Sequence, residues 1–178
     1  MSVNILDPGI QLSKVTSAHL GKVIAANGMV YDTKTIADYY SEGVAMVSYI
    51  SSTGHGYGLS LFDTTPSPWS TAGTTVASYS KPHPDGTSWA LPTLAQWNNM
   101  FAQFGGSAVG TDYACAKPYY SGTIRTKMTE CGGQNLEGSY WSATEYNSTI
   151  AHDYTFELNY WCGANKTGAC SIRPFFIF

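Results

Sequence analysis

The chain has 178 residues, which is enough for one ordinary domain and too few for two full ones. Charged residues make up only 12% and the net charge is −3, so there is no basic patch and we expect no nucleic-acid partner. No apolar run approaches the length of a bilayer span, and the start MSVNILDPGI lacks the features of a signal peptide, so we expect neither membrane insertion nor a secretion signal in this chain.

The first elements in chain order are a weakly patterned segment and a hairpin. Residues 1–20 show little periodicity and are interpreted as an N-terminal tail or assembly segment, ahead of one domain over residues 21–178. The stretch GKVIAANGMVYD then has two short β-type runs around Asn27-Gly28, the strongest short hairpin signal.

Two helices and two strands are expected next. TKTIADYYSEG predicts a short helix, with Thr33 as N-cap and Gly43 as the residue that ends it. VAMVSYIS and YGLSLFD follow as strands, separated by the glycine-rich turn STGHG. SPWSTAGTTVASY predicts a second helix, because its apolar residues recur at helical spacing at Trp69, Ala72, Val76 and Tyr79.

The clearest local element is SWALPTLAQWNNMFAQFGG. Thr93 can cap a helix that Gly105-Gly106 ends. The apolar stripe of this helix consists of Leu94, Trp97, Phe101 and Phe104.

The second half of the chain has weaker patterns. Residues 106–139 are rich in Gly, Ser, Thr and Tyr and are interpreted as a long surface insertion. From Tyr140 onward short strands alternate with turns, and the terminal IRPFFIF predicts an apolar strand whose Pro174 indicates a sheet edge or a bulge. The expected fold is a single α+β domain with two or three short helices around small antiparallel sheets.

Cys115, Cys131, Cys162 and Cys170 have no CxxC spacing and no nearby histidine suited to zinc. We therefore expect no metal site and no other cofactor. The even number of cysteines leaves disulfides open, although a chain of this length hardly needs them.

Three stretches carry a family resemblance: SWALPTLAQW, GGQNLEGSYWSATEY and the terminal KTGACSIRPFFIF. They resemble C-type-lectin-fold proteins of gut Bacteroidetes and their phages, and more narrowly the variable proteins of diversity-generating retroelements. The likeness is strong from Ser88 to the end, looser from Lys22, and absent over residues 1–20. It implies a C-type-lectin-like fold that brings its two chain ends together and displays an irregular C-terminal surface.

In such families a template copy rewrites the end of the gene by mutating adenines. Asparagine codons of the AAY type can then become any codon ending in a pyrimidine, a set without Lys, Glu, Gln, Met or Trp. Within the variable segment, about residues 147–171, only Glu157, Trp161 and Lys166 are of excluded types, and they are interpreted as framework. Further residues interpreted as scaffold are Tyr154, Phe156, Arg173 and Pro174.

The resemblance then assigns the ligand-binding positions. They are Asn147, Ser148, Thr149, Ile150, Asp153, Thr155, Leu158, Asn159, Tyr160, Cys162, Gly163, Ala164, Asn165, Thr167, Gly168, Ala169 and Cys170. The segment departs from the family pattern in three places: His152 stands where Trp is common, SIRP stands where VRP after a polar residue is commoner, and Glu157 lies among positions expected to vary. On this interpretation Cys162 and Cys170 are products of the mutagenesis and have no reason to pair.

The resemblance implies a non-enzymatic receptor-binding protein whose partner is a cell-surface receptor, protein or glycan, of a host or neighbouring cell. Tyr160 and Ile150 are the best candidate anchors, surrounded by small residues. Phage members of the family are receptor-binding tail proteins, so the expected location is a virion tail-fibre tip, as a homotrimer, or a bacterial cell surface.

Three alternatives remain open from the residues. A bacterial surface adhesin or pilus-tip lectin of fixed specificity would use the same surface, although the calcium-site strings EPN, QPD and WND are absent. A formylglycine-generating-type enzyme needs a close pair of reactive cysteines, for which only Cys162 and Cys170 are candidates, and nothing basic beside Cys162 would lower its pKa. An iron-dependent sulfoxide synthase needs several histidines, and the C-terminal half has only His152.

The remaining charged residues of the C-terminal segment have structural interpretations. Arg173 is expected to form an ion pair with Glu145. Asp153 and Glu157 have the spacing of two carboxylates on one face of a strand, which would be a catalytic pair only if a cleft lay beside them.

Overall fold

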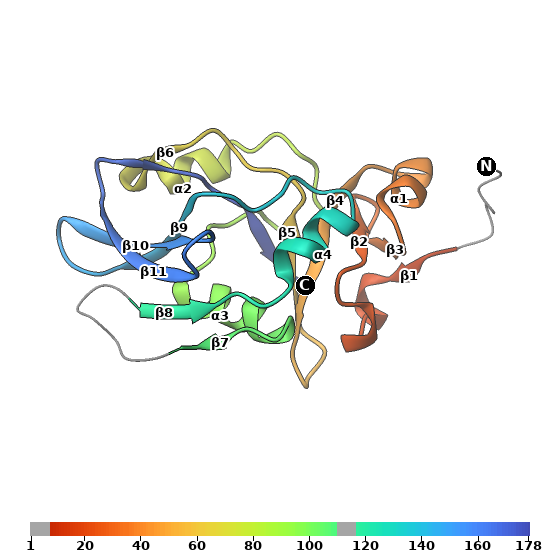
Figure 1. The fold of residues 1–178 in the computed structure, drawn as a ribbon. Helices are drawn as coiled ribbons and strands as arrows, with labels where there is room; N and C mark the ends of the chain where they lie inside the picture. The colour runs from red at the N-terminus through yellow and green to blue at the C-terminus, as the bar shows by residue number, and fades with distance from the viewer. Residues whose placement is uncertain (1–7, 110–116) are drawn as a thin grey trace.

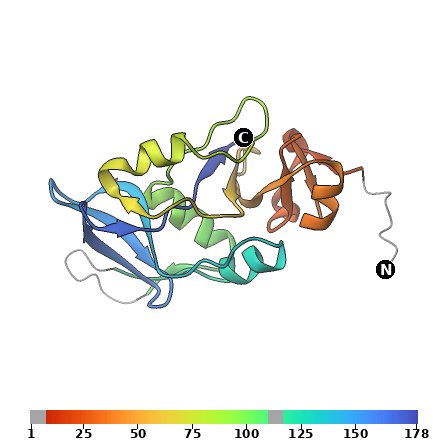
Figure 2. The same ribbon diagram turned by 90° about the horizontal axis from the view of Figure 1, so that it is seen from above.

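Two antiparallel sheets occupy opposite ends of the molecule (Figure 1, Figure 2). The computed structural model describes residues 8–109 and 117–178; residues 1–7 of the expected tail and Cys115 lie outside them. The first sheet has the order β1 (Ile10–Gln11), β3 (Met29–Tyr31), β2 (Val23–Ala25), β4 (Gly43–Ile50), β5 (Gly56–Ser60) and β13 (Phe175–Ile177). The second has the order β7 (Ser107–Ala108), β8 (Lys117–Tyr120), β11 (Tyr160–Asn165), β10 (Ile150–Thr155) and β9 (Ser139–Glu145).

A small third sheet and the helices complete the fold. Strands β6 (Ser67–Pro68) and β12 (Ala169–Cys170) pair with each other. The helices are α1 (Lys34–Tyr40), α2 (Trp69–Ala77), α3 (Leu94–Gln103) and α4 (Ile124–Glu130), with 3₁₀ turns at Leu12–Lys14 and Ser17–His19. The predicted α+β class with antiparallel sheets is therefore confirmed, with one helix more than expected among the described residues.

Local sequence signals account for the first elements. Asn27 Oδ1 accepts a hydrogen bond from Met29 N at 3.0 Å, and Gly28 takes a φ of 77°, so the predicted turn between β2 and β3 forms. Thr33 caps α1 by accepting from Ile36 N. Gly43 was expected to end this helix; instead α1 stops before Ser41, and Gly43 begins β4 with its N–H donated to Asp38.

Helix α3 packs against residues of both sheets. Thr93 and Gln96 form a reciprocal capping box at its start, and Gly105 follows its end with a φ of 81°. Trp97 and Phe101 are fully buried, as the apolar stripe predicted. Residues of both sheets pack against this helix in one core, whose aromatic members are Tyr31, Trp97, Phe101, Phe104, Tyr140, Tyr154, Phe156, Trp161 and Phe175.

The segment over residues 106–139 is not a surface insertion. Its described part contributes β7, β8 and α4, and it places Ile124, Met128 and Leu136 in the core. Ile124 and Met128 are four residues apart, so both fall on the inner face of α4. This spacing was present in the sequence but was too short a pattern to stand out among polar residues.

The described ends of the chain differ from the expected arrangement. Residues 10–20 are part of the domain, because β1 pairs with β3 and Val15 is buried. Strands β1 and β13 lie at opposite edges of the first sheet, so the chain ends are not brought together. The edge position of β13 agrees with Pro174, which precedes the strand and cannot donate to a ladder.

Arg173 is fully buried, and its ionic partner is Asp63 rather than Glu145. Arg173 Nε lies 2.6 Å from Asp63 Oδ1, and the two pair through charge without the angle of a hydrogen bond. The guanidinium donates to the Ser60 carbonyl at 3.1 Å and to the Gln134 carbonyl at 3.0 Å. Arg173 therefore ties the C-terminal segment to residues far away in the sequence.

Candidate ligand-binding surface

The β10–β11 hairpin carries most of the predicted binding positions. The two strands pair in register from Ile150↔Asn165 to Thr155↔Tyr160. Tyr154 and Trp161 form one pair of this register, and both are buried against α3. We call the remaining accessible positions the hairpin surface; they are Asn147–Ile150, Thr155, Leu158–Tyr160, Cys162–Asn165 and Thr167–Cys170.

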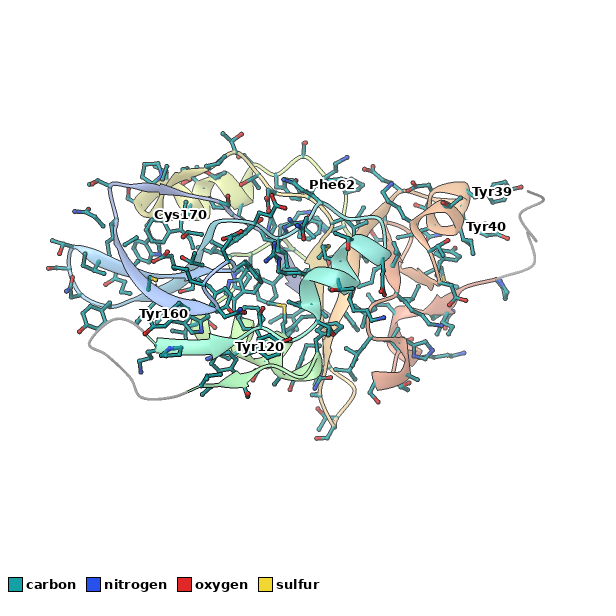
Figure 3. All side chains as sticks on the ribbon, in the orientation of Figure 1. Tyr39, Tyr40, Phe62, Tyr120, Tyr160 and Cys170 are labelled. Atoms are coloured by element: carbon teal, nitrogen blue, oxygen red, sulfur yellow. The ribbon has the colours of Figure 1, made fainter. Side chains whose placement is uncertain are left out.

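Figure 3 places the hairpin surface at one end of the molecule, where Tyr160 and Cys170 are labelled, and Tyr39 and Tyr40 of α1 at the other. Its positions come from β10, β11, β12 and the turns between them, so the structure brings the predicted residues together. Each is exposed or half-buried, from the exposed loop at Asn147–Thr149 to half-buried Cys170.

Asparagine side chains shape two of the turns on this surface. Asn147 Oδ1 accepts from Thr149 N at 2.9 Å and from Ile150 N at 2.8 Å, closing the loop that leads into β10. Asn165 Oδ1 accepts from Thr167 N at 3.0 Å in the same way after β11. Such asparagine turns replace backbone turns and explain the two Asn-x-Thr sequences of the segment.

The turn between β10 and β11 displays the most exposed apolar side chain of the surface. Leu158 is 69% exposed. Asn159 follows with a φ of 51°, a conformation that asparagine tolerates better than most residues. Its Oδ1 accepts from the Ser121 hydroxyl and from the Tyr154 hydroxyl, both at 3.2 Å, so the turn is fixed to the strands below it.

The three residues assigned to the framework are all anchored. Trp161 is 1% exposed and its indole N–H donates to Asn98 Oδ1 at 2.8 Å. Lys166 Nζ pairs with Glu145 at 3.1 Å and lies 4.7 Å from the centre of the Trp69 ring. Glu157 is exposed, yet both its oxygens accept from the backbone N–H of residue 138, at 2.9 and 3.0 Å.

Asp153 does not belong to the hairpin surface, although it was predicted to contact ligand. It is 3% exposed, and its Oδ1 has no hydrogen-bond partner among the described residues. In the central strand β10 it pairs with Cys162 on one side and with Trp141 on the other. With Glu157 exposed in the next turn, the two carboxylates do not form a pair.

Replacing Asp153 by asparagine should raise the free energy of unfolding at neutral pH. Burial raises the pKa of the Asp153 carboxyl above its ordinary 3.8, and the Ser139 hydroxyl only partly opposes this. The folded chain therefore holds this proton to higher pH than the unfolded chain does. Stability falls as the pH rises through the interval between 3.8 and the raised pKa, and the loss persists above it.

Urea denaturation of the Asp153→Asn variant between about pH 4 and about pH 7 should show that this part of the pH dependence is gone. The control is Asp85→Asn, which removes an exposed carboxylate from a loop. Equal pH dependence in the Asp153→Asn variant and the unchanged protein would contradict the assignment.

Neither cysteine of the surface, Cys162 or Cys170, forms a disulfide among the described residues. Burial, with smaller contributions from the nearby Asp153 and Cys162, raises the pKa of the Cys170 thiol to about 12. At neutral pH this thiol is protonated and a poor nucleophile. Among the described residues, His, Cys, Asp and Glu nowhere form a group of three that could hold a metal ion.

Two aromatic residues beside the surface, Tyr146 and Tyr120, are not among the predicted binding positions. Tyr146 is about half exposed and packs edge-on against His152, with ring centres 5.5 Å apart. Burial lowers the pKa of His152, so this ring is neutral at physiological pH. Tyr120, at the end of β8, is also exposed and lies near Asn159; only the pairing of β8 with β11 reveals this neighbourhood.

Comparisons with known proteins give few matches. No family model and no curated protein matches the chain. Among solved structures, the chain is similar to a fimbrial protein from Bacteroides ovatus ATCC 8483, with 14% identity and a TM-score of 0.43 over 89% of this chain. The aligned part is 48% of that protein, so the chain spans about half its length. At this TM-score the likeness establishes neither a shared fold nor a shared function.

In the described part of the chain, no helix is both long enough and apolar enough to cross a membrane.

Proposed function

We propose that the chain is a non-enzymatic ligand-binding protein, built on a C-type-lectin-like scaffold, whose hairpin surface is diversified by adenine-directed mutagenesis. The observation that carries this proposal is the contrast within residues 147–171. The three residue types that the mutagenesis cannot produce are anchored at Glu157, Trp161 and Lys166, and every candidate position except Asp153 is accessible.

This arrangement separates stability from binding. Each fully buried aromatic or large aliphatic side chain beneath the hairpin stabilises the fold by roughly 1.5–3 kcal/mol. Substitutions at exposed positions usually change stability by about 0.5 kcal/mol or less. Many different side chains can therefore occupy the hairpin surface over one unchanged core.

Binding by such a surface would depend on a few anchors. Tyr160 and Ile150 are half-buried and keep part of each side chain accessible, and Leu158 adds an exposed apolar side chain between them in sequence. Gly163 and Ala164 lie between these anchors on β11, and small residues beside anchors suit close approach of a partner. The partner is a cell-surface receptor, protein or glycan, on a host or neighbouring cell.

Display in several copies would strengthen a weak single site. A homotrimer at a phage tail-fibre tip would present three hairpin surfaces, and simultaneous binding can raise avidity by roughly 10²–10⁴. A bacterial surface protein that carries many copies would gain in the same way.

Thiol-based catalysis has little support in this geometry. An enzyme of the formylglycine-generating type would use Cys162 and Cys170, but burial and neighbouring negative groups hold the Cys170 pKa near 12. An activated thiolate needs the opposite environment, with a positive group beside the sulfur.

The first test is to sequence the 3′ end of the gene and its flanking DNA across a natural population. We expect a near-copy of the segment that encodes residues 147–171 nearby, with differences between individuals only at its adenines. The codons of Glu157, Trp161 and Lys166 should be constant. Uniform sequence without a template copy would overturn the diversification and leave a surface adhesin of fixed specificity.

A further inference from the structure

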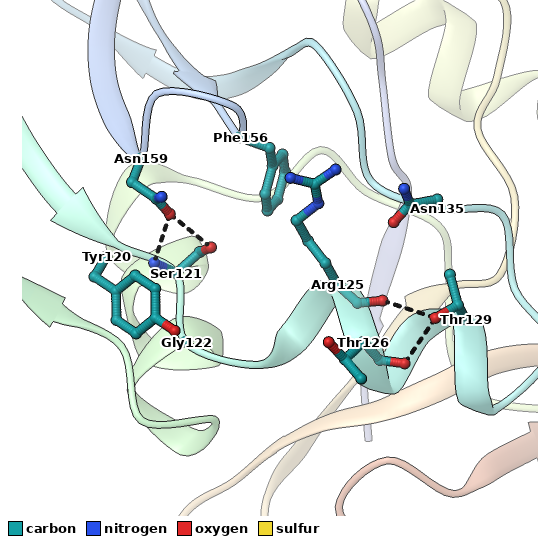
Figure 4. Close-up of a pocket in the computed structure, with 9 residues that line it drawn as sticks. All are labelled: Tyr120, Ser121, Gly122, Arg125, Thr126, Thr129, Asn135, Phe156 and Asn159. Carbon is teal, nitrogen blue, oxygen red and sulfur yellow. Dashed lines mark hydrogen bonds between the residues drawn. The ribbon is translucent and has the colours of Figure 1, made fainter.

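A cavity lies beside the hairpin surface, and seven of its nine lining residues lie outside the variable segment. It has a volume of about 420 Å³ and opens between the end of β8, helix α4 and the β10–β11 turn (Figure 4). Volumes of this size suit small-molecule ligands. Its lining residues are Tyr120, Ser121, Gly122, Arg125, Thr126, Thr129, Asn135, Phe156 and Asn159.

Arg125 is the only basic residue among the residues that line this cavity. Its side chain extends from α4 toward Phe156 in Figure 4. Among the described residues, no carboxylate pairs with its guanidinium and no acceptor takes a side-chain hydrogen bond from it, although the residue is half-buried. The acidic residues on adjoining segments have other partners: Glu130 pairs with Lys127, and Glu157 accepts from a backbone N–H. A half-buried guanidinium without a counter-ion favours an anionic ligand.

Other polar residues of the lining have hydrogen-bond donors or acceptors that remain available to a ligand. Asn159 Oδ1 is occupied by Ser121 and Tyr154, but within the described part of the chain its Nδ2 donates to no group. The Asn135 amide donates to Glu137 at 2.6 Å and leaves its own oxygen available. Thr126 adds a hydroxyl group. Amides and hydroxyls of this kind match the hydroxyl groups of a sugar, which both donate and accept.

An aromatic ring stands at the edge of the cavity. Tyr120 is about half exposed, so one ring face is open to a flat, partly apolar ligand. A pyranose ring has such a face, whereas an inorganic anion does not.

We propose that this cavity binds a carboxylated sugar, such as a uronic acid residue of an acidic glycan. The carboxylate pairs with Arg125, the sugar hydroxyls bond to Asn159, Asn135 and Thr126, and Tyr120 packs on the ring. Asn159 is the one candidate variable position in the site, so diversification of the hairpin surface would leave Arg125, Asn135, Thr126 and Tyr120 in place.

The test is titration of the intact chain with sodium D-glucuronate, in which binding is monitored by the changes of amide chemical shifts in NMR spectra. We expect shifts at Ser121, Gly122 and Asn159, and binding at least about tenfold weaker for D-glucose, which lacks the carboxylate. Arg125→Gln should weaken glucuronate binding by about tenfold or more, and Arg125→Lys should restore it only in part. The matched control is Lys127→Gln on the same helix, outside the cavity, which should bind as the unchanged protein does.

Each other outcome overturns the proposal. Sodium acetate or inorganic phosphate binding as tightly as glucuronate would make this a simple anion site and overturn the sugar assignment. Equal binding of glucose and glucuronate, no effect of Arg125→Gln in a variant with an unchanged melting temperature, or no shifts at the cavity residues would overturn the site itself. None of these results bears on the template copy that tests the proposed function.

Discussion

The Trp161→Ala variant should lose about 3–5 kcal/mol of unfolding free energy, which is a large part of the total of a typical domain. Trp161 is fully buried and packs against Tyr154 at a ring-centre distance of 5.2 Å. Its removal leaves a cavity under β11 and takes away the donor that holds Asn98 at 2.8 Å. The measurement is urea denaturation at neutral pH. It is monitored by the circular dichroism of the backbone, because tryptophan fluorescence would itself change in this variant.

The matched control for Trp161→Ala is Leu158→Ala, three residues earlier on the same hairpin. Leu158 is 69% exposed, so its truncation should change the unfolding free energy by about 0.5 kcal/mol or less. It should instead weaken binding of the receptor, once a receptor is in hand. Similar losses of stability in both variants would contradict the separation of a fixed core from an exchangeable surface.

The Arg173→Met variant should be destabilised by about 3–5 kcal/mol, because one partner of a buried ion pair is removed. Asp63 would keep its charge beside Tyr140, whose hydroxyl donates to it at 2.8 Å, but would lose the cation that pairs with it. The carbonyls of Ser60 and Gln134 would lose their donors as well. Burial already raises the pKa of Asp63 despite Arg173, so the variant should be less destabilised in acid than at neutral pH.

The double variant Arg173→Met with Asp63→Asn removes both charges of the ion pair and tests whether the two residues interact directly. Removing both charges should recover part of the loss, since no buried charge is then left unpaired. Arg125→Met is the matched control, because that arginine is half-buried and unpaired among the described residues. Losses that simply add in the double variant would contradict a direct interaction between Arg173 and Asp63.

Elements with strong local signals were predicted correctly from the sequence. The β2–β3 turn, α1, α2 and α3 follow from Asn27-Gly28, the caps at Thr33 and Thr93, and helical apolar spacing. Helix α4 was missed because its buried residues Ile124 and Met128 make only one helical repeat. Its position comes from packing against the core, which a short polar segment does not reveal.

Pairing between distant residues could not be predicted. Arg173 lies beside Asp63 because β13 pairs with β5, and nothing in the sequence near Arg173 marks that partner. Glu145, the nearer acid in sequence, pairs with Lys166 instead. The prediction of Asp153 as a surface residue was wrong for a related reason, since the strands on either side of it are placed by tertiary contacts.

The candidate surface was predicted better than its neighbourhood. Residue type alone marked Glu157, Trp161 and Lys166, and each makes an anchoring contact, although Glu157 is exposed. The cavity at Arg125 was not predicted, because its walls come from β8, α4 and the β10–β11 turn. Only the folded chain brings these segments together.

The asparagine turns at Asn147 and Asn165 affect what kinds of surface this scaffold can present. Each turn depends on a side-chain oxygen that accepts from a backbone N–H two residues later. Serine, threonine or aspartate could preserve that acceptor, whereas an apolar replacement would abolish it and alter the path of the backbone. Exchanges at these two positions would therefore change the contour of the loops, while exchanges at accessible positions inside β11, such as Cys162, would change only the chemistry displayed on an unchanged strand.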